Sequence, residues 1–355
     1  MSTRLARLRQ EMHERGMDAY FVSSLPNVRY LSGFSGSNGL CVVTGKEMVL
    51  VTDSRYARQS RVEARRCRRI VTSQGLIEAV AEDGNLKRVR NAGFEPDHIS
   101  YAQYRSLKRL FPGVTFLGHG DLGEDLALTK DPAEVENIRK SAGISDRVFM
   151  EVVSLIRPGV KEVELAAEIS YLQKRHGGER DAFEPIVASG ERALLPHARA
   201  TGKRIKHGEM AILDFGTTCG GFCSDLTRTV AVGKPSSRAR EMYALVLEAH
   251  GAAIAAARGG MMARDLDAVA RGILQRAGYG RYFVHSLGHG LGLSIHERPR
   301  VSPLSREELR SGSVITIEPG LYVPGVGGVR IEDDVLLTRT GCRVLTGAPR
   351  ELMIL

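Results

Sequence analysis

The 355-residue chain has 43% hydrophobic residues and a formal net charge of +9, which is typical of a globular protein large enough for two domains. No run of 18 apolar residues is present and no apolar segment follows the cationic N-terminus, so neither a membrane span nor a secretory signal is predicted. Five cysteines without paired CxxC spacing favour free thiols and a cytoplasmic location.

Helical and strand patterns alternate along the N-terminal part of the chain. This order predicts a compact α/β domain, and we find no cluster of catalytic residue types in it. The expected elements are a helix at residues 4–15, strands at 18–24, 40–43 and 48–52, and alternating helices and strands at 55–66, 69–72, 75–82, 87–93, 101–111 and 113–117.

Positive charge is densest over residues 55–69. A nucleic-acid site would join such a patch to aromatic stacking groups or a known binding module, whereas aromatic residues make up only 6% of this chain. We therefore expect a solvated helix face or a contact between subunits here, and no nucleic-acid partner.

The Gly- and Asp-rich segment 118–132 lacks clear periodicity and predicts a domain boundary, which divides the chain into residues 1–125 and 126–355. In the second part, runs of helix followed by runs of strand predict an α+β domain with a largely antiparallel sheet, and a weak internal repeat of two helices and an acidic hairpin. The expected elements are helices at 133–156, 161–175, 236–257 and 263–277, a strand near 183–189, a hairpin at 211–230, and strands at 282–287, 293–296, 313–318, 320–323, 329–337 and 343–346.

Two acidic residues interrupt the apolar runs of the hairpin at residues 211–230. Asp214 and Asp225 are symmetric about the midpoint between Cys219 and Gly220, so we expect the two carboxylates to face each other directly. Like charges in a direct cross-strand pair destabilise a sheet unless a cation lies between them. The hairpin therefore predicts a metal site, whereas Cys219 and Cys223 lack the partner ligands of a zinc site.

A second acidic pair supports this prediction. Glu318 and Glu332 lie in β-branched runs and are symmetric about Gly325, which predicts that they also face each other. A neutral ligand is available in His289, whose neighbours Gly288 and Gly290 leave room for a metal to approach the imidazole.

Four carboxylates and one imidazole suit hard or borderline divalent ions and carry too much negative charge for one ion. Two ions bridged by shared carboxylates fit this ligand set better, and such sites hold a bridging hydroxide as nucleophile. The set accepts Mn²⁺, Co²⁺, Zn²⁺ or Mg²⁺ and does not fix the metal. We expect Mn²⁺, with Co²⁺ or Zn²⁺ as alternatives.

The motifs LDFG, SDLTRT, GHGLGL, TIEPGLYV and VRIEDD resemble those of the pita-bread metallopeptidases, within which the Xaa-Pro dipeptidases (prolidases) and Xaa-Pro aminopeptidases are most similar. The stretches NVRYLSGFSGSNG and VTDSRY resemble their creatinase-like N-terminal domain, which methionine aminopeptidases lack. The resemblance implies an α+β pita-bread catalytic domain preceded by a smaller α/β creatinase-like domain.

The resemblance also implies a role for each ligand. Asp225 and Glu332 would bridge both ions, and Asp214 would complete the coordination of one of them. His289 and Glu318 would bind the other ion. Glu318 would also take a proton from the bridging water as general base and pass it to the leaving nitrogen.

Other side chains match residues that surround the metals in this family. His296 matches a histidine that hydrogen-bonds the scissile carbonyl, and His197 and His285 match histidines that line the substrate pocket. Arg330 matches an arginine that supports the bridging carboxylates.

The substrate depends on a different residue. Arg300 matches an arginine that pairs with the proline carboxylate in prolidases, and Arg298 is a nearby competitor. We therefore expect hydrolysis of Xaa-Pro dipeptides. The alternatives are an Xaa-Pro aminopeptidase acting on longer peptides, a non-catalytic binding protein on the same fold, and a C–N hydrolase of non-peptide substrates. The resemblance further implies a homodimer in which the loop at residues 35–38 helps to close the partner's active site.

Overall fold

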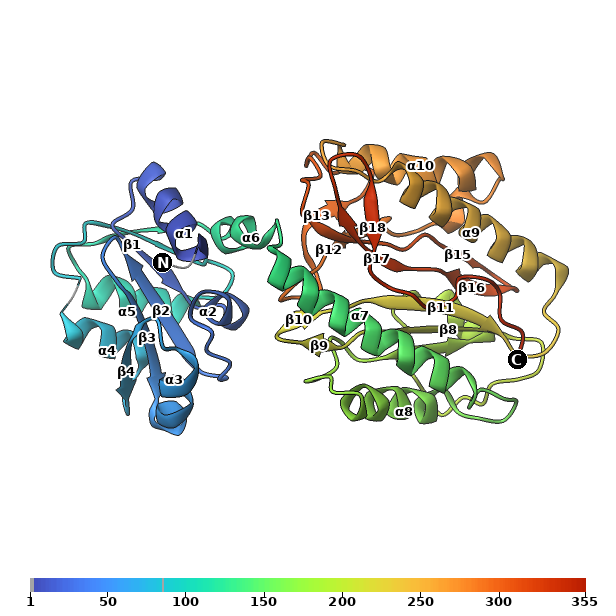
Figure 1. Cartoon of the computed structure of the whole chain (residues 1–355), viewed down its shortest axis with the longest axis horizontal. Helices are drawn as coiled ribbons and strands as arrows, with labels where there is room; N and C mark the ends of the chain where they lie inside the picture. The colour runs from blue at the N-terminus through green and yellow to red at the C-terminus, as the bar shows by residue number, and fades with distance from the viewer. Residues whose placement is uncertain (1–2, 85) are drawn as a thin grey trace. The chain divides into compact units, whose positions relative to one another are not determined.

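The computed structural model describes residues 3–84 and 86–355. These residues form two compact units, unit 1 over Met1–Ala127 and unit 2 over Leu128–Leu355 (Figure 1). Unit 1 is an α/β domain and unit 2 contains long helices and mainly antiparallel strands, so the predicted fold class is confirmed.

Unit 1 is built on a six-stranded sheet with the strand order β4-β3-β2-β1-β5-β6. Strand β2 is antiparallel to both of its neighbours, and the remaining pairs are parallel. The central strands read as continuous apolar runs because both faces are covered. Its elements are α1 Thr3–Glu14, β1 Ala19–Val22, α2 Leu25–Ser32, β2 Gly39–Thr44, β3 Met48–Asp53, η1 Ser54–Tyr56, α3 Ala57–Glu63, β4 Arg68–Thr72, α4 Leu76–Asp83, β5 Asn91–Phe94, α5 Tyr101–Leu110, β6 Thr115–Gly118 and α6 Asp121–Ala127.

The segment 118–132 is more ordered than its composition suggested, because α6 occupies much of it. The basic stretch 55–69 forms η1, α3 and the start of β4, and most of its arginines are exposed. Arg68 differs, since it pairs with Glu47 and Asp83 on neighbouring elements.

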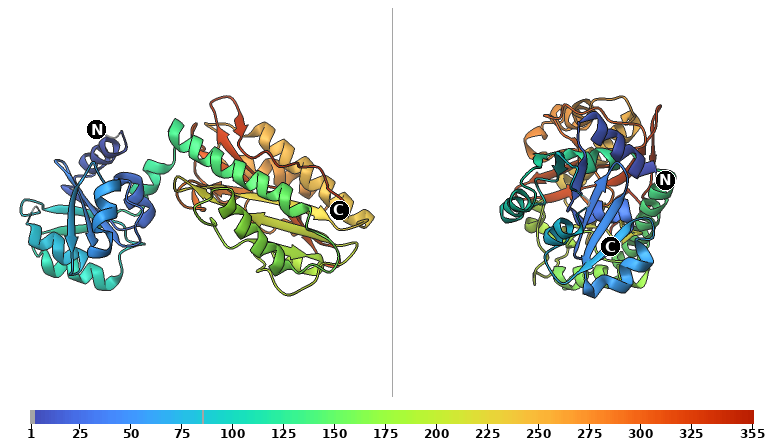
Figure 2. Two further views of the ribbon diagram at one scale, coloured as in Figure 1. Left: turned by 60° about the horizontal axis from the view of Figure 1, so that its bottom comes forward. Right: turned by 90° about the vertical axis from the view of Figure 1, so that its left-hand side faces the viewer.

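Unit 2 places its strands between two pairs of helices, as the views in Figures 1 and 2 show. The sheets are β11-β8-β7 and β13-β12-β14-β17-β18, with the two-stranded pairs β10-β9 and β15-β16. Each half of the unit has its own apolar core. The elements are α7 Pro132–Val153, α8 Glu162–Arg175, β7 Ile186–Ser189, η2 Gly190–Leu194, β8 Met210–Phe215, β9 Thr218–Cys219, β10 Phe222–Cys223, β11 Leu226–Ala231, α9 Ser237–Ala256, α10 Ala263–Arg276, η3 Gly280–Tyr282, β12 Gly288–Gly290, β13 Glu297–Val301, β14 Val314–Ile317, β15 Gly320–Val323, β16 Gly327–Arg330, β17 Asp333–Leu337 and β18 Cys342–Val344.

Two strand predictions in unit 2 are wrong. Residue 282 ends the short helix η3 and residues 283–287 form no strand, and residues 293–296 are a series of bends before β13. Phe283 and Leu287 are nevertheless buried, so their apolar alternation reflects core packing by an irregular segment.

All five cysteines are free thiols, as predicted. Among the helices of the described residues, none combines the length and the apolar character that crossing a membrane requires.

Candidate metal centre

The first acidic hairpin joins β8 to β11. In the register of these strands the direct partner of Asp214 is Thr227, so the prediction that Asp214 faces Asp225 is wrong. Asp225 precedes Thr227 by two residues and lies between β10 and β11. It is therefore a diagonal neighbour of Asp214 on the same face, where Cα atoms are about 7–8 Å apart.

The turn of this hairpin explains the shift. Gly220 and Gly221 both have positive φ, 59° and 84°, and Cys219 pairs with Phe222 across them. Two central residues with positive φ make the tight turn that suits the twist of a hairpin. The hairpin is consequently centred between the two glycines, one residue beyond the predicted centre.

The second acidic hairpin has the predicted register. Ile317 pairs with Asp333 in the β14–β17 ladder, and Gly320 pairs with Arg330 in the β15–β16 ladder. Both ladders are symmetric about Gly325, and the predicted centre of this hairpin is therefore confirmed.

Glu318 and Glu332 lie between these two ladders, where the hairpin passes from one sheet to another. The backbone N–H of Glu318 donates to the carbonyl of Leu287 at 2.8 Å, and that of Glu332 donates to the carbonyl of Thr227 at 3.1 Å. Where strand pairing breaks, each acidic residue therefore hydrogen-bonds to a different segment. The hydrogen bond of Glu332 joins the second hairpin directly to the first.

His289 lies on β12. Its Nδ1 is 3.0 Å from the carbonyl oxygen of Gly290, which only accepts, so Nδ1 carries the proton and Nε2 presents a lone pair. Nε2 lies 3.7 Å from Oδ2 of Asp225 and 3.5 Å from Oε1 of Glu318. Burial lowers the pKa of His289 to about 4, which keeps the ring neutral and suited to binding a metal.

The packing of the strands beside β12 constrains the glycines around His289. A Cβ atom at Gly288 would collide with the carbonyl of Thr316, and one at Gly290 would collide with the carbonyl of Arg298. The glycines are thus required by the close approach of the strands beside β12.

Three side chains from the two hairpins and β12 converge. Asp225, His289 and Glu332 each offer a ligand atom, and these atoms all lie within 4.8 Å of one another. Oδ1 of Asp225 is buried and has no hydrogen-bond partner among the described residues, as expected of an oxygen reserved for a ligand. The donor set of carboxylate oxygens and an imidazole nitrogen fits divalent metal ions.

Electrostatics support the same assignment. Burial, reinforced by the neighbouring carboxylates, raises the pKa values of Asp225 and Glu332 well above their usual range. Burial, opposed by Arg330 and assisted by Asp214, raises the pKa of Glu318 to about 8. So many buried carboxylates are ionised together only when cations compensate their charge.

Arg330 is buried beside the cluster and binds Asp214 through its guanidinium. It also donates to Oγ1 of Thr227 at 3.1 Å and to the hydroxyl of Tyr322 at 2.6 Å. The expected support of the bridging carboxylates stays a prediction, and the acid that Arg330 contacts directly is Asp214. It reaches Glu332 through Thr227, whose hydroxyl donates to Oε2 of Glu332 at 2.6 Å.

The three histidines that the resemblance assigns to the site lie in different environments. The His296 ring is exposed and meets the His289 ring edge-on, with centroids 4.5 Å apart. Nε2 of His285 is 3.0 Å from the hydroxyl of Tyr322, and burial, assisted by Arg330, lowers the pKa of His285 to about 3. His197 is exposed on the segment after η2 and acts electrostatically on both His285 and His296.

The two candidate carboxylate-binding arginines are distinguished by their partners. Arg298 pairs with Glu307 at 2.7 Å. Arg300 is the direct β-ladder partner of His289, which puts both side chains on one face of the sheet. It is exposed, and its Nε donates to Oγ of Ser286 at 3.0 Å in a cavity of about 490 Å³ that His285 also lines.

Sequence reasoning missed several side chains that hold this site. Thr227 and Asp334 follow Asp225 and Glu332 by two residues, so strand alternation alone would have placed them on the ligand faces. Asp334 accepts the N–H of Asp225 at 3.0 Å, and Tyr322 joins His285 to Arg330. Tyr322 has no comparable local signal.

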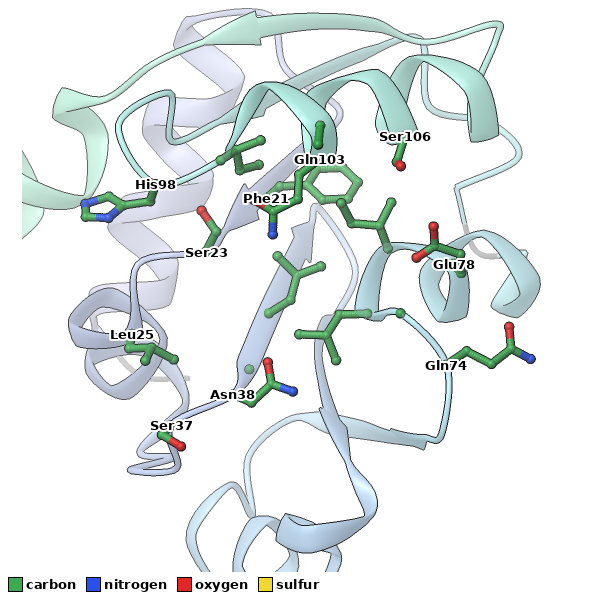
Figure 3. Close-up of a pocket in the computed structure, with 17 residues that line it drawn as sticks. Phe21, Ser23, Leu25, Ser37, Asn38, Gln74, Glu78, His98, Gln103 and Ser106 are labelled. Carbon is green, nitrogen blue, oxygen red and sulfur yellow. The ribbon is translucent and has the colours of Figure 1, made fainter.

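Unit 1 contains a separate cavity of about 570 Å³. Its lining includes Phe21, Ser23, Asn38, Glu78 and Gln103 (Figure 3). It lies near the carboxyl end of β1, which has β2 on one side and β5 on the other. Ligands of open α/β sheets bind outside the carboxyl ends of the strands.

A carboxylate of the protein already accepts hydrogen bonds from backbone N–H groups at the start of the helix beside this cavity. Glu95 is buried and accepts the N–H groups of Ser23 and Ser24 at 2.6 Å each, at the start of α2. Asn27 donates to its other oxygen at 2.6 Å. The place where a phosphate would meet a helix N-terminus is therefore taken by a side chain of the protein.

Comparison with known proteins agrees with this site. Residues 136–339 match Metallopeptidase family M24, and residues 4–126 match the Creatinase/Prolidase N-terminal domain. An Xaa-Pro dipeptidase of Pyrococcus furiosus is 40% identical over 354 residues, with 99% of this chain and 100% of that protein covered.

Solved structures give the same result. An Xaa-Pro dipeptidase from Bacillus anthracis is 38% identical with a TM-score of 0.96, and 99% of each chain is covered. An X-Pro aminopeptidase from Thermotoga maritima is 36% identical with a TM-score of 0.92, covering 99% of this chain and 100% of that one. The chain therefore belongs to metallopeptidase family M24 and begins with a creatinase/prolidase N-terminal domain.

Proposed function

We propose that this metallopeptidase is a dinuclear-metal Xaa-Pro dipeptidase. The observation that carries the proposal is the convergence of Asp225, His289 and Glu332 in a chain whose full length matches proteins named Xaa-Pro dipeptidase. Arg300, on the same face of the sheet as His289, supports the dipeptide preference.

Five side chains would hold two divalent ions, which we expect to be Mn²⁺ among the several metals that the oxygen-rich donor set accepts. Asp225 and Glu332 would contact both ions, and Asp214 would complete one site. His289 and Glu318 would complete the other. When bound, the ions supply Lewis-acid polarisation of the scissile carbonyl and a water of lowered pKa.

The surrounding residues move and hold protons. Glu318 would accept the proton of the attacking water at a carboxylate oxygen and return it to the proline nitrogen. His296, exposed beside His289, would donate a hydrogen bond to the oxygen of the scissile carbonyl. These steps involve only the carbonyl oxygen and the proline nitrogen of the scissile bond. They therefore suit an Xaa-Pro bond, because its tertiary amide has no N–H to which a peptidase could hydrogen-bond.

Recognition of the proline carboxylate is assigned to Arg300. The side chain of Arg298 is paired with Glu307, whereas that of Arg300 donates to Ser286 in a cavity that His285 and Glu307 also line. A guanidinium can bind a carboxylate through two parallel hydrogen bonds, so a dipeptide would gain an interaction that a longer peptide cannot make in the same way.

An Xaa-Pro aminopeptidase is the second candidate, favoured by the full-length similarity to the X-Pro aminopeptidase from Thermotoga maritima. The two activities share the metal centre and differ in what binds beyond the proline. Substrate length therefore separates them.

The deciding experiment uses Mn²⁺-reconstituted protein with Ala-Pro, Leu-Pro and the matched Ala-Pro-Ala and Leu-Pro-Ala. We expect turnover of the dipeptides, and efficient turnover of the tripeptides would favour the aminopeptidase. In Arg300→Ala we expect KM to rise at least about tenfold for dipeptides because a charged hydrogen bond is lost. Arg298→Ala is the matched control. An equal effect of Arg300→Ala on tripeptides contradicts the carboxylate assignment.

The homodimer and the cytoplasmic location stay predictions. The loop expected to reach a partner is fastened within unit 1, since Ser37 contacts Tyr56 at 2.5 Å and Asn38 donates to Asp53 at 2.6 Å. Small-angle scattering at working concentration measures the oligomeric state directly.

A further inference from the structure

A buried ion pair lies next to the metal centre and belongs to neither acidic hairpin. Nζ of Lys130 is 2.9 Å from Oε2 of Glu297, and their side chains are only 1% and 10% exposed. A buried charge is tolerated when it is paired, so each partner restricts where the other can lie.

Glu297 is built into the segment that carries His296. Its Oε1 accepts the N–H of Ser294 at 2.9 Å, and a Cβ atom at Gly292 would lie 2.6 Å from Oε2. The carbonyl of Gly292 accepts the N–H of Cys223 at 2.6 Å, which attaches the segment to the first hairpin. The Glu297 carboxylate therefore fixes the backbone of residues 292–297.

Lys130 is itself fixed at both its backbone and its side chain. Its N–H donates to the carbonyl of Gly312 at 2.8 Å, just before β14. The next residue, Asp131, caps α7 in a reciprocal arrangement with Glu134. The ammonium group thus projects from a rigid junction between a helix and the strand that leads to Glu318.

The geometry of β12 and β13 makes His296 depend on this pair. His289 pairs with Arg300, but Gly290 pairs with Glu297, so the register shifts between them. His296 immediately precedes Glu297, and its ring meets that of His289. A displacement of Glu297 would therefore move His296 relative to the metal centre.

We propose that Lys130 and Glu297 are positioning residues that hold His296 in its place beside His289. The proposal rests on the carbonyl-binding role of His296 proposed above. Lys130 acts at a distance, through Glu297 and the segment 292–297.

The test is a double-mutant cycle in the full-length, Mn²⁺-reconstituted protein with a dipeptide substrate. Lys130→Met should lower kcat about 10- to 100-fold, as loss of outer supporting partners commonly does, with bound Mn²⁺ and KM little changed. In a His296→Ala background the same substitution should lower kcat less than about threefold, because residues acting through one another are not additive.

Three further variants separate positioning from simple stability. Lys130→Met combined with Glu297→Met replaces the pair by apolar side chains, which should recover thermal stability but leave kcat low. If Lys130→Met does not fold, Glu297→Gln replaces it in the double-mutant cycle. Lys203→Met breaks a Lys–Glu pair of 2.7 Å elsewhere in unit 2 and should leave kcat within about twofold.

The outcomes are distinguishable. Additive losses in the His296→Ala background, an unchanged kcat in Lys130→Met, or recovery of kcat together with stability in the apolar double variant each overturn the positioning role. If His296→Ala alone keeps full kcat, the proposed role of His296 fails first.

Discussion

The two acidic hairpins of unit 2 present their carboxylates in different ways. In the first, the two-glycine turn at Gly220 and Gly221 makes Asp214 and Asp225 diagonal neighbours. In the second, the ladders on both sides are centred on Gly325, so Glu318 and Glu332 occupy symmetric positions between them.

The two aspartates consequently differ in their contacts. Asp214 binds Arg330, whereas Asp225 joins the converging group with His289 and Glu332 and keeps an unpartnered buried oxygen. The offset register thus lets Arg330 bind one aspartate, while the other keeps a buried oxygen for a ligand.

The largest effect is expected from the converging carboxylates. Asp225→Ala and Glu332→Ala should lose bound Mn²⁺ and lower kcat/KM by at least about a thousandfold, because Lewis-acid stabilisation is worth several kcal/mol. Asp214→Ala should retain more metal than either. Elemental analysis with steady-state kinetics checks this, and equal metal loss in all three variants would contradict the proposed division between the aspartates.

Removing the metal should change the pH dependence of stability. The pKa of Glu318 is raised to about 8, and those of Asp225 and Glu332 are also raised, by burial first and by neighbouring carboxylates. The folded chain then keeps protons that the unfolded chain releases above about pH 4.3. Its unfolding free energy should therefore fall as pH rises toward 8, by about 1.4 kcal/mol per pH unit for each such group.

Thermal unfolding of chelator-treated protein at pH 5, 6.5 and 8, with and without added Mn²⁺, measures this slope. Bound Mn²⁺ favours the ionised carboxylates and should remove or reverse it. Glu318→Gln should reduce the slope of the metal-free protein. Parallel pH profiles in both conditions would show that the carboxylates do not form the metal centre.

The smallest effect concerns the turns. Gly220 and Gly325 have φ of 59° and 75°, so an alanine at either position should destabilise the fold by about 1 kcal/mol. A Cβ atom at Gly220 would also lie 2.6 Å from Nδ2 of Asn137, whereas nothing lies within 4 Å at Gly325. Urea unfolding and Mn²⁺ titration should show a larger loss for Gly220→Ala, and the reverse order would contradict the role assigned to the two-glycine turn.

Much of this arrangement could be predicted from local patterns. Alternation of side chains along a strand made each acidic residue conspicuous in an apolar run, and the motifs around them indicated the family before any contact was visible. The centre at Gly325 was also predictable, because a single flexible turn joins two strands of equal length. The assignment of the five proposed ligands to two ions stays a prediction, although the structure brings three of them together.

Contacts between distant segments could not be predicted in this way. The turn at Gly220 and Gly221 was placed one residue too early, because several positions in a TTCGG sequence allow a tight turn. The close approach of Thr316 and Arg298 to the glycines beside His289 has no signal in the local sequence.

Local sequence patterns were enough to identify the side chains that are chemically out of place: four carboxylates in apolar strands and a histidine between glycines. The partners of the buried charged groups followed only from the tertiary structure. Arg330 binds Asp214 across 116 residues, and Lys130 binds Glu297 across 167. The physical reason is that strand alternation is a property of neighbouring residues, whereas burial of a charge is resolved only by whichever distant group the packed fold brings beside it.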